Sequence, residues 1–167
     1  MKSGSPTCKK DRTVWANLNY ANVKENAEKM YKWENNSSVQ SGLLTGKAWE
    51  TTCKWIEDEI RKINNSSTLS DSRYYGNYGN SMSPANEGAG AVRTAGFSEN
   101  WKTKNIYDLA GNLYEWTYET SGSNHLGRGG CVANYGNLCP VSYLASNILT
   151  YQERWVGFRI RLYIKTD

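Results

Sequence analysis

The residues that could carry chemistry are few and lie far apart in the chain. The four cysteines are Cys8, Cys53, Cys131 and Cys139, and none of them belongs to a C-x-x-C pair. The single histidine, His125, sits in the polar stretch SGSNHLG. Because a zinc site needs clustered cysteine and histidine ligands, we expect none here. We expect His125 to lie in a surface loop and Cys53 to be a buried thiol on a helix.

One carboxylate, Glu115, stands in the stretch NIYDLAGNLYEW, residues 105–116. The Asp, Gly and Asn residues at 108–112 predict a tight turn. A strand should follow, with Leu113, Glu115 and Thr117 on one face. Glu115 is then either a buried ligand or a solvated residue. We favour the solvated interpretation, because carboxylates are rarely buried unpaired.

Two helices are expected to precede this stretch. Residues 22–33 follow a helical period, with Asn22 and Glu25 as a capping box. Residues 46–63 predict a second helix, with Thr45 as its N-cap. The expected apolar stripes are Val23, Ala27, Met30 and Tyr31 in the first helix, and Trp49, Cys53, Ile56 and Ile60 in the second.

The rest of the chain predicts strands and loops. Residues 69–104 are rich in Gly, Asn, Ser and Tyr without a period, which indicates a long irregular segment. Residues 156–164 alternate strictly between apolar and other residues. That pattern predicts a half-buried strand with Val156, Phe158, Ile160, Leu162 and Ile164 facing the core.

Length and charge restrict the possible functions. A chain of 167 residues is expected to form one domain, residues 1–167. The net charge is +4, but the basic residues are dispersed, so we expect no nucleic-acid partner. No stretch is apolar enough for a membrane span, and the start of the chain does not resemble a signal peptide. The sequence does not identify the cellular compartment, and a cell surface or a phage particle is the suspected location.

Three spaced blocks carry a family resemblance: GNLYEW at 111–116, RGG at 128–130 and GFRIRLYI at 157–164. Their order resembles the formylglycine-generating (sulfatase-modifying) enzyme superfamily. The resemblance implies an α+β, C-type-lectin-like fold. We therefore expect two N-terminal helices, short antiparallel strands and much irregular loop.

The catalytic residues of that superfamily are incomplete here. The oxidases carry two cysteines after the Gly-Gly pair, and these thiols hold a copper ion. Cys139 falls at the second position, but Asn134 occupies the first, and Asn is a poor ligand for soft Cu(I). The iron-binding relatives need a histidine cluster that one histidine cannot supply. We therefore expect no enzymatic activity and no required cofactor.

A second branch of similar fold fits better. The variable proteins of diversity-generating retroelements carry a C-terminal variable segment on a skeleton that resembles R-G-G-x-x-x-N-x-G-x-x-x-P-x-S. This chain matches that skeleton with Arg128, Gly129, Gly130, Asn134, Gly136, Pro140 and Ser142. The resemblance implies that residues 131–155 are a candidate variable, ligand-binding segment. Tyr, Trp, Asn and Ser there suit a binding surface.

The candidate ligand-binding residues are those between the skeleton positions. They are Val132, Tyr135, Asn137, Leu138, Tyr143, Leu144, Asn147, Ile148, Tyr151, Gln152, Glu153, Arg154 and Trp155. The implied partner is a protein or glycan ligand on a cell or phage surface. The alternative for the segment is an ordinary long loop packed by its own aromatic residues. The alternatives for the whole protein are a sulfatase-modifying-type oxidoreductase or a structural surface or phage-tail paralogue.

The superfamily resemblance also implies a calcium site. A calcium ion is often held around the G-N-x-x-E-W block, which places Asn112 and Glu115 as candidate ligands. Calcium prefers six to eight oxygen ligands, and only these two side chains are indicated. We therefore treat calcium as a possible ligand of the protein and not as a required cofactor.

Overall fold

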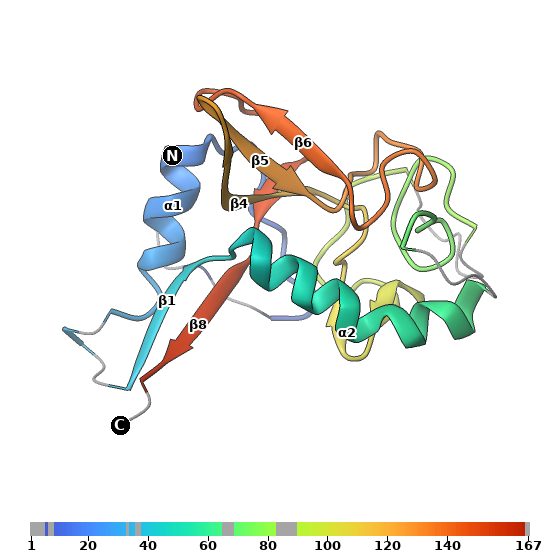
Figure 1. Cartoon of the computed structure of the whole chain (residues 1–167), viewed down its shortest axis with the longest axis horizontal. Coiled ribbons are helices and arrows are strands. Elements are labelled where there is room, and N and C mark those ends of the chain that lie inside the picture. The colour runs from blue at the N-terminus through green and yellow to red at the C-terminus, as the bar shows by residue number, and fades with distance from the viewer. Residues whose placement is uncertain are drawn as a thin grey trace.

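The computed structural model describes residues 6, 9–32, 34–35, 38–64, 69–82 and 90–165, and Figure 1 shows their arrangement. Its fold is a mixture of helices and several small sheets. The elements in chain order are α1 (Tyr20–Glu28), β1 (Val39–Leu43), α2 (Gly46–Asn64), the short 3-10 helix η1 (Glu99–Trp101), β2 (Lys102–Thr103), β3 (Ile106–Tyr107), β4 (Tyr114–Ser121), β5 (Asn124–Arg128), β6 (Leu144–Asn147), β7 (Val156–Phe158) and β8 (Ile160–Ile164). Cys8 lies outside the described residues.

The main sheet has the strand order β6-β5-β4-β7. β4 pairs with β5 and β5 with β6 in antiparallel fashion. β7 pairs with the other edge of β4 in parallel, with Glu115 opposite Gly157. The expectation of antiparallel strands throughout was therefore wrong for this pair, because the chain returns to β4 through the long segment after β6 and not through a hairpin.

The first helix begins earlier than its sequence pattern indicated. Asn19 is the N-cap, and its side chain accepts a hydrogen bond from the backbone N–H of Asn22. The predicted capping box at Asn22 and Glu25 was wrong, since Asn22 already lies in the first turn of α1. The helix also ends at Glu28, so Tyr31 lies beyond it and is exposed.

The second helix follows its prediction closely. Thr45 Oγ1 accepts from the N–H of Ala48 at 3.2 Å, which satisfies a free donor in the first turn. The stripe Trp49, Cys53, Ile56 and Ile60 is fully buried and forms one hydrophobic cluster with Tyr75, Tyr78, Leu109 and Val141. Burial raises the pKa of the Cys53 thiol to about 12, which keeps it protonated and unreactive.

The C-terminal strand is only partly a core strand. The alternation breaks at Arg159, which separates β7 from β8. Val156 is buried, but Leu162 and Ile164 are 50% and 73% exposed. β8 pairs only with β1, and Figure 1 shows this two-stranded ribbon extending away from the main sheet and α2. The apolar face of β8 therefore extends beyond the main sheet and α2, which leaves Leu162 and Ile164 exposed.

The histidine lies in a strand, and the prediction of a surface loop was wrong. His125 is the second residue of β5 and pairs with Thr120 of β4 and Asn147 of β6. Its ring stacks on Tyr20 of α1 with centroids 3.5 Å apart. Burial lowers the pKa of His125, which favours the neutral imidazole.

Candidate ligand-binding site

The candidate segment, residues 131–155, starts and ends on the main sheet. It leaves β5 through the turn Gly129-Gly130, whose φ angles are +89° and +69°. A Cβ on Gly130 would lie 2.3 Å from the carbonyl oxygen of Cys139. Only glycine fits this turn, because a side chain would meet strain and a backbone clash together. The segment then includes β6 and returns to the sheet at β7.

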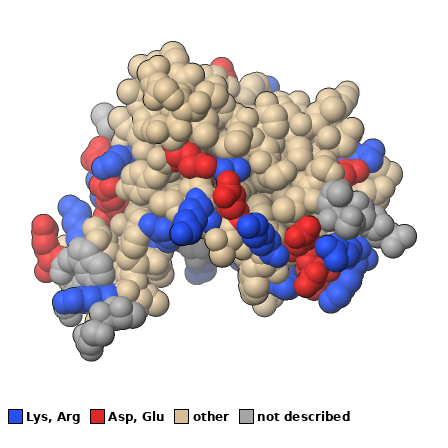
Figure 2. All heavy atoms as spheres, in the orientation of Figure 1, with Lys and Arg blue, Asp and Glu red and all other residues tan. Residues whose placement is uncertain are grey.

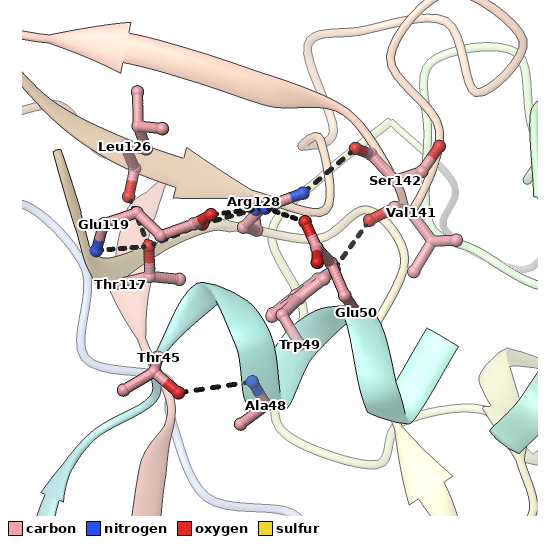
Figure 3. Close-up of polar contacts among 10 residues, drawn as sticks. All are labelled: Thr45, Ala48, Trp49, Glu50, Thr117, Glu119, Leu126, Arg128, Val141 and Ser142. Carbon is pink, nitrogen blue, oxygen red and sulfur yellow. Dashed lines mark hydrogen bonds and ion pairs between the residues drawn. The ribbon is translucent and has the colours of Figure 1, made fainter. Parts of the chain in front are cut away.

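A buried arginine holds the start of the segment in place (Figure 3). Arg128 is 3% exposed, and its guanidinium donates to both carboxylate oxygens of Glu119 at 2.7 and 2.6 Å. The same group donates to Glu50 of α2 at 3.2 Å and to the carbonyl of Ser142 at 3.4 Å. One side chain thus links β5, β4, α2 and the segment, and the fork of donors makes this possible.

The irregular residues 69–82 form the support beneath the segment. The Tyr78 hydroxyl donates to the carbonyl of Gly129 at 2.7 Å, and Ser72 Oγ accepts from the N–H of Val141 at 2.8 Å. The Trp49 indole of α2 donates to the carbonyl of Val141 at 2.9 Å. In Figure 1 this green stretch lies beside the orange loop above α2. Residues 69–82 of the predicted irregular region are therefore packed structure.

The skeleton residues of the segment are structural. Asn134 Oδ1 accepts from the backbone N–H of Cys131 at 3.0 Å, which closes a local turn. A Cβ on Gly136 would lie 2.8 Å from the Tyr78 ring and 2.9 Å from the nitrogen of Arg73. Asn80 also bonds the N–H of Gly136, at 2.9 Å. These side chains fix the path of the backbone and leave little room for replacement.

The residues between the skeleton positions point mostly to solvent. The large apolar ones are Tyr135, Leu138, Tyr143, Leu144 and Ile148, with exposures of 57%, 66%, 36%, 45% and 61%. Asn137, Gln152 and Arg154 are also exposed, and Asn147 and Glu153 are half-buried. Val132 is the exception, since it is 7% exposed and belongs to the interior. Its assignment to a ligand-contacting surface was therefore wrong.

Two of the candidate aromatic residues act partly as packing residues. Tyr151 and Trp155 are half-buried and pack against the hydrophobic cluster that contains Trp116 and Val156. The rings of Tyr151 and Trp116 meet edge to face, with centroids 6.4 Å apart. The alternative of a loop packed by its own aromatics therefore holds for the end of the segment, while Tyr135 and Tyr143 are displayed.

The segment also encloses a cleft of about 350 Å³, open to solvent. It is lined by Tyr114, Cys131, Ala133, Asn134, Tyr143, Ala145, Ser146, Asn147, Tyr151 and Trp155. Only Tyr114 comes from outside the segment, and its ring lies 6.3 Å from that of Tyr143. Four aromatic rings and three small polar side chains thus surround one space, which is within the size range of small-ligand sites.

The site prediction missed part of this lining. Six lining residues were not among the predicted ligand-contacting residues: Tyr114, Cys131, Ala133, Asn134, Ala145 and Ser146. Asn134 was assigned to the skeleton, and it also lines the cleft. Tyr114 follows the predicted turn and gave no signal, because its proximity to the segment arises only from the pairing of β4 with β5 and β7.

Glu115 and Asn112 do not form a calcium-binding set. Glu115 is 8% exposed, so the solvated interpretation was wrong, and both its oxygens accept from the Arg159 guanidinium at 2.9 and 2.8 Å. Burial raises the pKa of Glu115, and the charge of Arg159 opposes that shift. Asn112 Oδ1 accepts from the N–H of Arg93 and from the side chain of Asn77.

A calcium ion would have to displace these partners. Among the described residues, no group of three or more His, Cys, Asp or Glu side chains could hold a metal ion. Because Arg159, Arg93 and Asn77 already bond the side-chain oxygens of Glu115 and Asn112, these two residues alone do not fit calcium, which takes six to eight oxygen ligands.

The cysteines of the segment are arranged for packing. Cys131 is 1% exposed, and its thiol donates to Asn134 Oδ1 at 3.2 Å. Burial raises the pKa of Cys131 to about 11, which keeps this thiol protonated. Asn134, which aligns with the first copper-binding cysteine of the formylglycine-generating enzymes, accepts a hydrogen bond from this thiol.

The comparisons with known proteins bear on the fold. The structure is similar to that of Treponema denticola variable protein 1, with a TM-score of 0.52 and 20% sequence identity. The match covers 75% of this chain and 48% of that one, so the chain spans about half its length. No protein-family model matches the chain, and no curated protein does.

This likeness establishes a shared fold. It is consistent with the predicted C-type-lectin-like architecture. Neither the family models nor the curated proteins support the resemblance to the formylglycine-generating enzymes. Along the described helices, none is long and apolar enough to cross a membrane.

Proposed function

We propose that the protein is a non-enzymatic binding protein that presents a diversified surface, residues 131–155, on a lectin-like scaffold, as the variable proteins of diversity-generating retroelements do. The partner is a protein or glycan ligand on a cell or phage surface. The observation that supports the proposal is the contrast between buried skeleton residues and the exposed residues that lie between them. Skeleton residues such as Arg128 and Gly136 are buried and bonded, whereas Tyr135 and Leu138 between them are displayed.

The physical logic matches that of other diversified binders. A variable surface requires positions that tolerate any residue, and substitutions away from buried features usually change stability by less than about 0.5 kcal/mol. Exposed Tyr residues supply a large contact area at low entropic cost. The supporting residues 69–82 and α2 hold the backbone of the segment while its exposed side chains change.

A pair of libraries tests this proposal without a known ligand. The first randomises the exposed positions Tyr135, Asn137, Leu138, Tyr143, Leu144 and Ile148. The matched library randomises Arg128, Gly130, Asn134, Gly136, Pro140 and Val141. We expect most members of the first library to fold and to yield binders to unrelated antigens in display selections, and most members of the second to unfold. Equal loss of folding in both libraries would contradict the proposal.

The coding DNA supplies an independent test of diversification. A template repeat of the region encoding residues 131–155, with a reverse-transcriptase gene beside it, is expected. Their absence would leave a binding scaffold without a source of variation, which favours the structural-paralogue alternative.

The oxidoreductase alternative predicts a measurable product. Incubation of the protein with copper, oxygen and a cysteine-containing sulfatase peptide should leave the mass of the peptide unchanged. Conversion of the peptide cysteine to the aldehyde would overturn the non-enzymatic assignment.

A further inference from the structure

The cleft within residues 131–155 has an unusual chemical character. None of its lining residues carries a charge. Residues 131–150 contain no Asp, Glu, Lys or Arg, in a chain where these types make up 22% of all residues. In Figure 2 the upper part of the molecule, over β5 and β6, shows few charged side chains, while blue and red groups form a band across the middle of this face and toward its left and lower right.

The cleft nevertheless has hydrogen-bonding capacity to spare. Asn134 is oriented by the N–H of Cys131, which bonds its oxygen and leaves its amide nitrogen as a donor. Within the described part of the chain, no protein group hydrogen-bonds the side-chain amide of Asn147 or the hydroxyl of Tyr143. Tyr143 is 36% exposed and Asn147 is half-buried, so both polar groups can pair with a ligand that enters the cleft from solvent.

The aromatic residues define the shape of the space. Tyr114, Tyr143, Tyr151 and Trp155 surround it, and their rings offer flat apolar faces. A bound group must therefore combine an apolar face with several neutral hydrogen-bonding groups at its edges. The lining itself offers no countercharge to a charged group that loses its hydration. The Arg154 guanidinium, which is not part of the lining, lies over the Trp155 ring at 4.9 Å from its centroid.

From these observations we propose that the cleft binds one neutral sugar unit of a glycan, with the C–H face of the ring against the aromatic residues and its hydroxyls bonded to Asn134, Asn147 and Tyr143. This inference rests on the proposed function and names the ligand class of the same surface. Tyr135 and Leu138 lie outside the cleft lining and serve as its matched controls.

Ligand-observed NMR with defined glycosides tests the inference. The probes are methyl glycosides of neutral hexoses and N-acetylhexosamines, with N-acetylneuraminic acid as the charged comparison. We expect at least one neutral glycoside to bind and the charged sugar not to bind. Tyr143→Ala and Asn147→Leu should each weaken binding by tenfold or more, while Leu138→Ala should change the Kd by less than twofold. Asn147→Leu is nearly isosteric, so it provides a second variant if Tyr143→Ala fails to fold.

The outcomes separate this inference from the proposed function. If no neutral glycoside binds, or if binding survives both cleft substitutions, the sugar site is wrong. If the exposed-position library still yields binders in that case, the binding-scaffold proposal stands alone. If that library fails to fold, the proposed function fails whatever the glycosides do.

Discussion

Arg128 is the residue on which the position of the segment depends most. Its side chain is 4% exposed, and its main partner Glu119 is 23% exposed. Removing one member of a buried ion pair leaves the other charge without compensation. We expect Arg128→Met to cost about 3 kcal/mol, near the low end for such pairs, because Glu119 keeps some contact with water.

Equilibrium denaturation of Arg128→Met measures that cost. The matched control is Lys24→Met, which removes an exposed i,i+4 partner of Glu28. That change should cost less than about 0.5 kcal/mol. Equal effects of the two substitutions would show that the Arg128 network adds nothing beyond a surface pair.

His125 makes the stability depend on pH. Burial lowers its pKa in the folded state, so the unfolded chain binds the proton more readily. Stability should therefore fall as the pH drops below the unfolded value of about 6.5. The comparison is His125→Phe, which keeps a ring against Tyr20. As the pH is lowered from 7.5 to 5.5, the unfolding free energy of the variant should fall less than that of the protein with His125. A constant difference would mean that His125 titrates alike in both states.

At the scale of the elements, the segment divides into displayed and packed parts. Tyr135 is 57% exposed, so Tyr135→Ala should alter stability by about 0.5 kcal/mol or less. Tyr151 packs edge to face on Trp116, and Tyr151→Ala should cost roughly 2 kcal/mol, about half the value for a fully buried aromatic. Thermal and chemical unfolding of the two variants measure these two losses of stability. A larger loss for Tyr135→Ala than for Tyr151→Ala would reverse the assignment of the two parts.

The elements also show what the sequence could and could not predict. The period of α2 and its Thr45 cap are local signals, and both were read correctly. The start of α1 was wrong because Asn19, three residues before the predicted cap Asn22, caps the helix. The parallel pairing of β4 with β7 was not predictable, since it depends on where the chain returns after β6.

The candidate site was also predictable where its signals are local and not where they depend on distant parts of the chain. The skeleton Gly129-Gly130 and Gly136 follows from backbone conformation and close approach, which sequence spacing reflects. Burial of Glu115 was missed because its partner Arg159 lies 44 residues away in the chain. Tyr114 was missed in the cleft because only the assembled sheet brings it beside Tyr143.

For the whole molecule, the arrangement around Glu115 predicts the response to calcium. Both carboxylate oxygens already bind Arg159, and the site offers too few free oxygens for an ion that takes six to eight. We expect the Tm to stay unchanged when millimolar calcium or a chelator is added. Differential scanning calorimetry in both conditions, with magnesium as the control ion, checks this. A rise in Tm specific to calcium would restore the site that the family resemblance implied.

The order β6-β5-β4-β7 means that the segment departs and returns on opposite edges of the same strand, β4. Its two ends are thus fixed by the sheet whatever the chain does between them. The entropy of closing a loop rises only slowly with its length, by about 0.6 kcal/mol for each doubling. Within residues 148–155, between β6 and β7, Tyr151 and Trp155 pack against the cluster that contains Trp116, and the carbonyl of Leu149 accepts from the N–H of Tyr20. An insertion there would add little loop-closure entropy but would have to preserve these contacts, so the length of the loop is more restricted than the side chains at Tyr135 and Leu138.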